Sequence, residues 1–273
     1  MPLDLPGSLL LAGAGNMGGA LLAGWLENGL APARIIVQDP NPSPAIAALL
    51  AKYGLKAEAA PQLAAAPAVI VVAVKPQIMG QVFPGVAKQA GADTVVLSIA
   101  AGKTVASFEA CLAPRTAVVR AMPNTPASVG RGITAAFANA HVTPHQKVLC
   151  DTLLGAVGAV GWVDDERLID AATAVSGSGP AYVFLLAECL AEAGVNAGLP
   201  ADLAAQLARW TVAGAGELLH RSELSAATLR QNVTSPNGTT HAALQVLMAD
   251  DGLQRLMTEA VAAASKRSAE LAR

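Results

Sequence analysis

The first half of the chain alternates short runs rich in β-branched residues with helical stretches. The runs predict strands at residues 9–12, 35–38, 69–74, 95–99 and 118–120, and two more at 133–138 and 159–163. Helical patterns occupy residues 20–28, 45–53, 80–89 and 105–112. This alternation is typical of an α/β fold, in which helices cover both faces of a mostly parallel sheet. The last two strands are expected at the far edge of that sheet.

Beyond about residue 164 the pattern changes to long helical periods with almost no β-branched runs. Ser178 and Pro180 predict an N-cap and an early helical proline for a helix that runs to Ala193. Further helices are predicted at residues 201–220 and 242–248, and from 253 to the C-terminus. Apolar residues recur on most faces of these helices, so we expect an oligomer built through this half; a self-contained helical bundle is the alternative. The predicted domains are residues 1–163 and 164–273.

Length and charge narrow the classes of protein. A chain of 273 residues can form two domains that each bury a core. The formal charge is −2 at pH 7 and no Lys/Arg cluster follows a predicted helix, so a nucleic-acid surface is not expected, and a small neutral or acidic metabolite fits better. The apolar stretch at residues 63–74 is broken by Pro67 and is shorter than the roughly 20 residues of a membrane span, so no membrane contact is expected.

The N-terminus and the cysteines bear on the compartment. Residues 1–7 contain Asp4 and two prolines and lack the basic segment that begins a signal peptide, so we predict a cytoplasmic protein. Cys111, Cys150 and Cys189 are widely spaced and set among apolar residues, which indicates reduced, buried thiols. No His is suggestively placed beside them, and no metal site is predicted.

A glycine-rich motif joins the first predicted strand to the first predicted helix. It consists of Gly13, Ala14, Gly15, Asn16, Met17 and Gly18. Gly13 permits a tight turn, Gly15 lets a diphosphate approach the backbone, and Gly18 allows close helix packing. In this strand–turn–helix context the motif predicts a dinucleotide site on a Rossmann-type doubly wound sheet, with an all-α C-terminal oligomerisation domain.

An acidic residue ends the second predicted strand. Asp39 lies 21 residues after Gly18, where a carboxylate can accept hydrogen bonds from the adenosine ribose hydroxyls. A carboxylate there also repels a 2′-phosphate, so the cofactor is expected to be NADH rather than NADPH, although Asn41 and Ser43 leave NADPH open. The alternative is that Asp39 is simply a turn residue.

Residues 234–240 place hydroxyls, a proline and a glycine between two helical patterns. Hydroxyl donors and free backbone N–H groups at the start of the next helix, predicted at residues 241–248, make a cradle for a carboxylate or phosphate. The alternative is an ordinary link between helices with Ser/Thr caps.

Further motifs match one family in order and position. They read KPQ at residues 75–77, RAMPNTP at 120–126, LID at 168–170 and SGSGPAY at 176–182. With Asn232 and the loop at residues 235–240, the chain resembles pyrroline-5-carboxylate reductases over essentially its full length. Each motif is modest, but their common register is specific.

The resemblance implies reduction of 1-pyrroline-5-carboxylate to L-proline by hydride from NADH or NADPH, the last step of proline biosynthesis. The residues it assigns to the cofactor are Gly13, Ala14, Gly15, Asn16 and Met17 at the diphosphate, Val74, Lys75 and Pro76 along its length, Ala100 and Ala101 near its nicotinamide end, and Asn124 in the turn beside it. The residues it assigns to the substrate are Ser235, Gly238, Thr239 and Thr240, with Glu166 and Asn232 nearby. It also implies an intertwined homodimer that can assemble further. In that dimer the substrate loop and the cofactor come from different subunits.

Reduction of an electrophilic imine needs little acid–base machinery. We assign Thr240 to the ring nitrogen as the catalytic residue, and Ser235 with the N–H groups near Gly238 and Thr239 to the substrate carboxylate. His241 is either a general acid or a capping or surface residue. Three other residues have a structural role as the alternative to a functional one. Glu166 would begin a helix, where its charge suits the helix dipole. Lys75 would be a solvated lysine at a strand end, and Tyr182 a core residue.

Two departures from the family pattern are Asp39, where relatives that accept NADPH often carry a small hydroxyl residue, and Asn237, where Gly is usual. Asn tolerates a positive φ better than most residues, so the turn can survive. One rival is a β-hydroxyacid dehydrogenase, but such enzymes use a lysine from the helical domain, and this chain has none between Lys147 and Lys266. The other rival is a non-catalytic NAD(P)-binding sensor.

Overall fold

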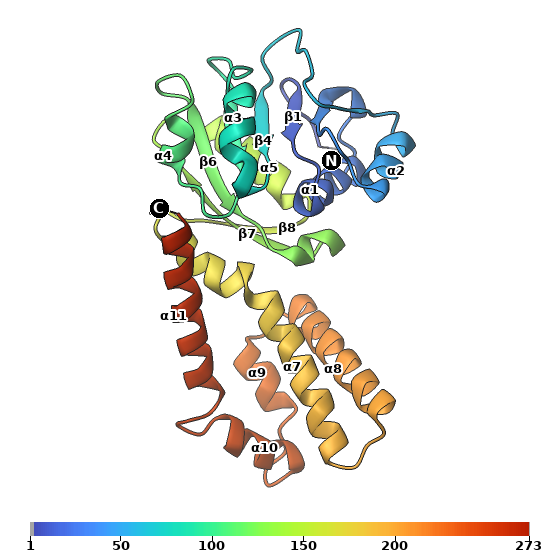
Figure 1. The fold of residues 1–273 in the computed structure, drawn as a ribbon. Helices are drawn as coiled ribbons and strands as arrows, with labels where there is room; N and C mark the ends of the chain where they lie inside the picture. The colour runs from blue at the N-terminus through green and yellow to red at the C-terminus, as the bar shows by residue number, and fades with distance from the viewer. Residues whose placement is uncertain (1–2, 273) are drawn as a thin grey trace. The chain divides into compact units, whose positions relative to one another are not determined.

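The protein, described for residues 3–272 by a computed structural model, contains an eight-stranded sheet (Figure 1). The strands are β1 (Leu9–Ala12), β2 (Ile35–Gln38), β3 (Ala57–Glu58), β4 (Val69–Val72), β5 (Val95–Ser98), β6 (Ala117–Met122), β7 (Gly132–Ala138) and β8 (Gly158–Trp162). Their order is β3-β2-β1-β4-β5-β6-β7-β8, and all neighbours pair in parallel except β6 and β7. The predicted sheet and its two last strands at the far edge are therefore confirmed.

Helices connect the strands and make up most of the second half. The α-helices are α1 (Asn16–Glu27), α2 (Pro44–Lys52), α3 (Met79–Ala87), α4 (Val105–Glu109), α5 (Pro144–Gly155), α6 (Leu168–Ala172), α7 (Gly179–Asn196), α8 (Ala201–Arg221), α9 (Ala226–Asn232), α10 (Thr239–Leu247) and α11 (Leu253–Leu271). Short 3₁₀ turns are η1 (Pro32–Arg34), η2 (Pro76–Ile78) and η3 (Thr125–Val129), and η4 (Thr173–Gly177) is a π-helical turn. Ser178 takes the N-cap position of α7, but its side chain makes no capping bond.

The elements β3, α5 and α9 were not predicted from the sequence pattern. The two residues of β3 are too few to form a pattern. The start of α5 did carry a signal, because Thr143 and Gln146 form a reciprocal capping box around Pro144. The start of α9 is capped by Ser225, whose hydroxyl accepts from the N–H of Thr228.

Alternate residues of the central strands feed two buried clusters, one on each face of the sheet. Leu9 and Leu11 join the cluster covered by α1, α2 and α5, in which the Trp25 indole donates to the Leu153 carbonyl at 2.8 Å. Leu10 and its even-numbered neighbours join the cluster covered by α3 and α4. Both faces are buried, so the strands read as continuous apolar runs rather than alternating ones.

The chain forms two compact units. The first, which we call the Rossmann unit, contains residues 1–177 and the end of the chain from Ala264, and the second, the helical unit, is Ser178–Ala263. The unit that holds the sheet thus extends past the expected boundary at residues 163/164 and takes in the end of α11. A functional boundary at 163/164 stays a prediction.

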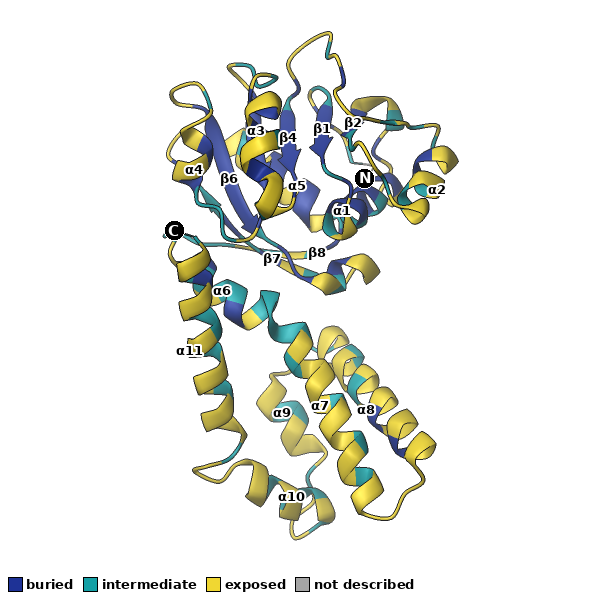
Figure 2. Cartoon of the chain, viewed as in Figure 1, coloured by how far each residue is buried: buried dark blue, intermediate teal, exposed yellow. Residues whose placement is uncertain are grey.

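The helical unit has almost no buried core (Figure 2). Helices α7 and α8 pack along each other, yet α8 buries only Ala204 and Ala208, and among the described residues α7, α9 and α10 bury none. Large apolar side chains such as Phe184 and Trp210 are exposed in the single chain. Helices that are apolar on most faces and remain uncovered need a partner surface.

One helical segment of the described chain, Leu168–Asn196, is long and apolar enough to cross a membrane by length and composition. The segment is interrupted by polar residues such as Ser178 and Glu188, so it does not stand out as a continuous apolar run in the sequence. The expectation that the protein makes no membrane contact stays a prediction.

Candidate functional site

The glycine-rich loop turns directly from β1 into α1. Gly13 has a φ of +91°, and a Cβ added there would lie 2.8 Å from the Ala73 carbonyl oxygen. At Gly18 a Cβ would lie 2.3 Å from the Gly13 carbonyl oxygen. Both positions therefore require glycine for the tight turn and the close helix packing that the motif predicted.

Gly15 has a different environment. A Cβ added there would meet nothing within 4 Å, so the space beside it is open. Gly15 is also the N-cap of α1, and no side chain caps this helix end in the described chain. Open space beside the uncapped N-terminus of a twelve-residue helix fits a diphosphate, which binds through backbone N–H groups and the helix dipole.

Asp39 is bonded to the same loop. Its Oδ2 accepts from the N–H of Ala14 at 2.8 Å, and its Oδ1 accepts from the N–H of Asn41 at 2.9 Å. The carboxylate thus holds the glycine loop and the turn after β2 together. Each oxygen keeps a second lone pair, so these bonds leave capacity for ribose hydroxyls.

The other predicted cofactor residues lie at the carboxyl ends of parallel strands. Val74, Lys75 and Pro76 follow β4, Ala100 and Ala101 follow β5, and Asn124 follows β6. The chain reverses its direction of strand addition between β1 and β4, and open α/β sheets bind ligands at such a switch point. Lys75 is exposed, whereas Val74 and Ala100 are buried.

The Asn124 side chain is already engaged by the backbone. Its Nδ2 donates to the Ser176 carbonyl at 3.1 Å, and its Oδ1 accepts from the N–H of Ile133 at 2.9 Å. The residue is buried. Its side chain therefore shapes the turn after β6.

The predicted substrate loop contains a tight turn. The N–H of Gly238 donates to the Ser235 carbonyl at 3.0 Å, and Asn237 has a φ of +61°. A proline in the second position and a positive φ in the third are typical of a type II turn. The prediction that Asn237 can take the place of Gly at a positive φ is thus confirmed.

Helix α10 begins at Thr239, earlier than predicted, because the turn ends at an extended Gly238 that serves as its N-cap. No side chain of the described residues caps this helix. The N–H groups of Thr239, Thr240 and His241 therefore lie in the first turn, where a helix has no internal partners for them. Asn232 ends α9, and Ser235 is exposed.

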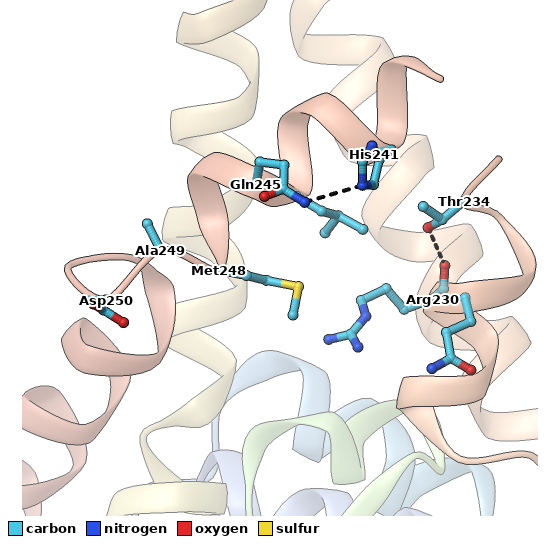
Figure 3. A pocket seen from close by; sticks show the side chains of 9 residues that line it. Arg230, Thr234, His241, Gln245, Met248, Ala249 and Asp250 are labelled. Carbon is cyan, nitrogen blue, oxygen red and sulfur yellow. Dashed lines mark hydrogen bonds between the residues drawn. The ribbon is translucent and has the colours of Figure 1, made fainter. Parts of the chain in front are cut away.

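A pocket of about 700 Å³ lies between α9 and α10 within the helical unit (Figure 3). Arg230, Thr234, His241 and Met248 are among its lining residues. The His241 ring lies 3.2 Å from the Gln245 side-chain nitrogen, one turn along the same helix. The Thr234 hydroxyl donates to the Arg230 carbonyl at 2.6 Å.

Glu166 belongs to the Rossmann unit, where its Oε1 makes two contacts. Nη1 of Arg120 lies 2.9 Å away, and the N–H of Val105 donates to the same oxygen at 2.8 Å. Arg120 is buried, and its Nη2 lies 3.6 Å from Asp170. Glu166 thus has a structural partner that the sequence did not indicate.

The chain is similar to known proteins along nearly its whole length. It is 43% identical over 261 residues to the pyrroline-5-carboxylate reductase of Pseudomonas aeruginosa, and the match covers 95% of each chain. The chain belongs to the pyrroline-5-carboxylate reductase family.

Solved structures agree with this membership. A pyrroline-5-carboxylate reductase from Coxiella burnetii has a TM-score of 0.90 and 38% identity, covering 98% of this chain and 100% of that chain. The Plasmodium falciparum pyrroline carboxylate reductase, solved with NADP bound, has a TM-score of 0.80 and 28% identity, covering 98% and 99%. The predicted family and the predicted fold class are both confirmed.

The family models match each half separately. Residues 166–271 match pyrroline-5-carboxylate reductase dimerisation, and residues 9–102 match NADP oxidoreductase, coenzyme F420-dependent. The reductase is therefore an NAD(P)H-dependent oxidoreductase with a dimerisation region, which accounts for the uncovered helices. The β-hydroxyacid dehydrogenase and sensor alternatives are not favoured.

Three residues that were not predicted to have a role, Arg120, Asp170 and Ser268, are joined to Glu166 by the structure. One signal was available, because an arginine in the apolar run AVVRAM must find partners if the strand is buried. The identity of those partners depends on contacts between distant segments.

Proposed function

We propose that this protein reduces 1-pyrroline-5-carboxylate to L-proline with NAD(P)H. Family membership across both halves carries the proposal, and the uncapped N-termini of α1 and α10 support it chemically. Each offers backbone N–H groups to an anion, the diphosphate at one and the substrate carboxylate at the other. When bound, the nicotinamide supplies the hydride.

The substrate is held by the turn at Ser235 and the start of α10. Ser235 and the N–H groups near Gly238 and Thr239, at the start of α10, bind the carboxylate, with Asn232 beside them, and the Thr240 hydroxyl bonds the ring nitrogen. Both structural contacts of Glu166 use Oε1, which leaves Oε2 for the substrate pocket.

The cofactor is held at the carboxyl edge of the sheet. Gly13, Ala14, Gly15, Asn16 and Met17 cradle the diphosphate, Val74, Lys75 and Pro76 lie along the molecule, Ala100 and Ala101 border the nicotinamide end, and Asn124 shapes the adjoining turn. Asp39 binds the ribose and favours NADH, because its charge repels a 2′-phosphate. A homodimer in the cytoplasm, in which the two sites come from different subunits, completes the proposal.

The reaction is tested by following cofactor absorbance with and without 1-pyrroline-5-carboxylate, using NADH and NADPH in parallel. We expect substrate-dependent oxidation of the cofactor and formation of proline. Tight cofactor binding without turnover on either cofactor would instead indicate a sensor and reject the reductase proposal.

The role of Thr240 is tested with Thr240→Ala and the matched Thr240→Ser, which keeps the hydroxyl. A hydrogen bond to a charged group is worth about 1.5–3 kcal/mol, so the alanine variant should lose about 10- to 100-fold in kcat. The serine variant should stay near wild type. Equal kcat values for the alanine and serine variants would contradict a hydrogen bond from the Thr240 hydroxyl to the ring nitrogen.

The role of Asp39 is tested with Asp39→Asn, which keeps an acceptor for the Ala14 N–H but removes the charge. The ratio of kcat/KM for NADPH to that for NADH should rise. Asp39→Ser should raise the same ratio while weakening both cofactors, because the loop contact is also lost. If the ratio of kcat/KM for NADPH to that for NADH were unchanged in both variants, Asp39 would not select the cofactor and would only bond the glycine loop.

A further inference from the structure

Arg120 occupies an unusual position for a charged side chain. It lies in β6, which is paired with β5 on one side and β7 on the other, and it is buried. Its guanidinium faces two carboxylates, with Nη1 at 2.9 Å from Glu166 and Nη2 at 3.6 Å from Asp170. A planar fork can bind two such groups at once, which the single ammonium of a lysine cannot reproduce.

The Glu166 contact reaches the loop between β5 and α4. The oxygen that binds Arg120 also accepts from the N–H of Val105, where this loop ends. At the start of the loop, the Ser98 hydroxyl accepts from the N–H of Ala100 at 3.2 Å. Ser98 is the residue that pairs with Arg120 across the two strands, so both ends of the loop are held from neighbouring positions of the sheet.

The end of the chain covers the middle of the same loop. Gly102 has a φ of +67°, and a Cβ added there would lie 3.1 Å from the Leu271 carbonyl oxygen. The Ser268 hydroxyl, on the same last turns of α11, donates to Asp170 at 2.7 Å. Arg120 and Asp170 thus connect the last turns of α11 to the cluster that holds the loop.

We propose that Arg120 is a positioning residue for the reductase reaction, fixing residues 99–104 through Glu166 and Asp170 so that they form one wall of the nicotinamide end of the site. The proposal rests on the proposed function, in which Ala100 and Ala101 border that end. Arg120 itself needs no contact with substrate or cofactor. Hydride transfer depends on close positioning, so a small shift of this wall lowers the rate.

The test compares the binding of NADH with that of ADP-ribose, which lacks the nicotinamide. Both are measured by titration calorimetry on the full-length wild type and on Arg120→Lys. We expect Arg120→Lys to lower the NADH affinity about tenfold relative to that of ADP-ribose, since ADP-ribose relies on the glycine loop and Asp39. kcat should fall as well. A change of both affinities by the same factor, or of neither, would overturn the proposal.

Ser268→Ala provides a second variant in case Arg120→Lys does not fold, because it removes only the outermost bond of the cluster. Its matched control is Ser265→Ala, one turn earlier on α11. Ser268→Ala should lower the ratio of NADH affinity to ADP-ribose affinity, by a smaller factor than Arg120→Lys does. Ser265→Ala should leave this ratio unchanged. Equal ratios in these two variants would reject the proposal. Wild-type protein that binds neither ligand would instead reject the proposed function.

Discussion

The Rossmann unit and the helical unit differ in how far they bury their apolar side chains within one chain. In the Rossmann unit, β1, β4 and β5 are buried along their whole length, and two clusters fill the faces of the sheet. In the helical unit, a long apolar helix such as α7 buries none of its described residues within the chain. The first unit carries its own core, whereas the second, which matches a dimerisation model, leaves its apolar side chains exposed in the single chain.

The difference extends to the chemistry. The predicted cofactor residues lie in the unit that is complete within one chain, at strand ends held by a rigid sheet. Most predicted substrate residues lie in the unit that needs a partner, on a short turn and the first turn of α10. Cofactor binding should therefore tolerate disruption of the assembly better than turnover does.

The largest expected effect comes from placing a charge in the apolar surface of the helical unit. Phe184→Asp changes a side chain that is 63% exposed in the single chain, and the matched Val148→Asp changes one that is 64% exposed in the Rossmann unit. An unpaired charge buried at an interface costs about 3–5 kcal/mol, and a symmetric dimer contains it twice. Light scattering should find monomers for Phe184→Asp only. A dimer in both variants would contradict the comparison.

The next effect concerns the core of the Rossmann unit. Leu153→Ala removes a fully buried side chain of α5 that packs in the cluster with Trp25. The free energy of unfolding, measured with urea, should fall by about 2–5 kcal/mol because a cavity remains. The dimer should persist, so stability and assembly would respond to different units. Loss of the dimer by this variant would mean that the units are not separable in this way.

Two glycines of the glycine loop are expected to affect different properties: Gly15 the affinity for the cofactor, and Gly18 the stability of the fold. Gly15→Ala adds a methyl group to open space where a diphosphate approaches, so the affinity for NADH should fall at least about tenfold, or about 1.4 kcal/mol, with an unchanged melting temperature. Gly18→Ala places its methyl group 2.3 Å from the Gly13 carbonyl oxygen and should destabilise the fold by about 1–3 kcal/mol. Calorimetry and thermal unfolding measure the two effects. Equal changes in affinity for both variants would contradict the assignment of Gly15.

The smallest effect is a dependence of stability on pH. Of the three cysteines predicted to be buried, Cys150 is buried, whereas Cys111 and Cys189 are exposed in the single chain, so the prediction was wrong for those two. Burial, together with the nearby Asp151 charge, raises the pKa of the Cys150 thiol from 9.0 to about 12. Above pH 9 the thiol ionises in the unfolded chain but stays neutral in the folded one, so its contribution to stability declines as the pH rises from about 9 towards 12. The stability gap between wild type and Cys150→Ala should therefore be narrower at pH 10 than at pH 7.5 in urea unfolding. A constant gap would contradict the raised pKa.

Much of the fold was accessible from local pattern. The bounds of β1 and β2 agree with the predicted runs to the residue, because buried parallel strands are continuous apolar segments. The glycine loop was equally readable, since a tight turn constrains residue type at Gly13 and Gly18. The short β3 was not, because a two-residue strand exists only through its pairing with β2.

Periodicity, turn chemistry and motif spacing were thus sufficient to predict the α/β half, the helical half and the need for a partner, and the residues of both anion sites stay predictions. Tertiary structure alone decided that Asp39 holds the glycine loop, that Asn124 bonds to Ser176, and that Arg120, Glu166 and Ser268 belong to one polar cluster. The reason is physical: a local pattern reports which side chains must be buried or must bend the backbone. A buried polar group takes its partner from whichever distant segment the fold brings within hydrogen-bonding distance.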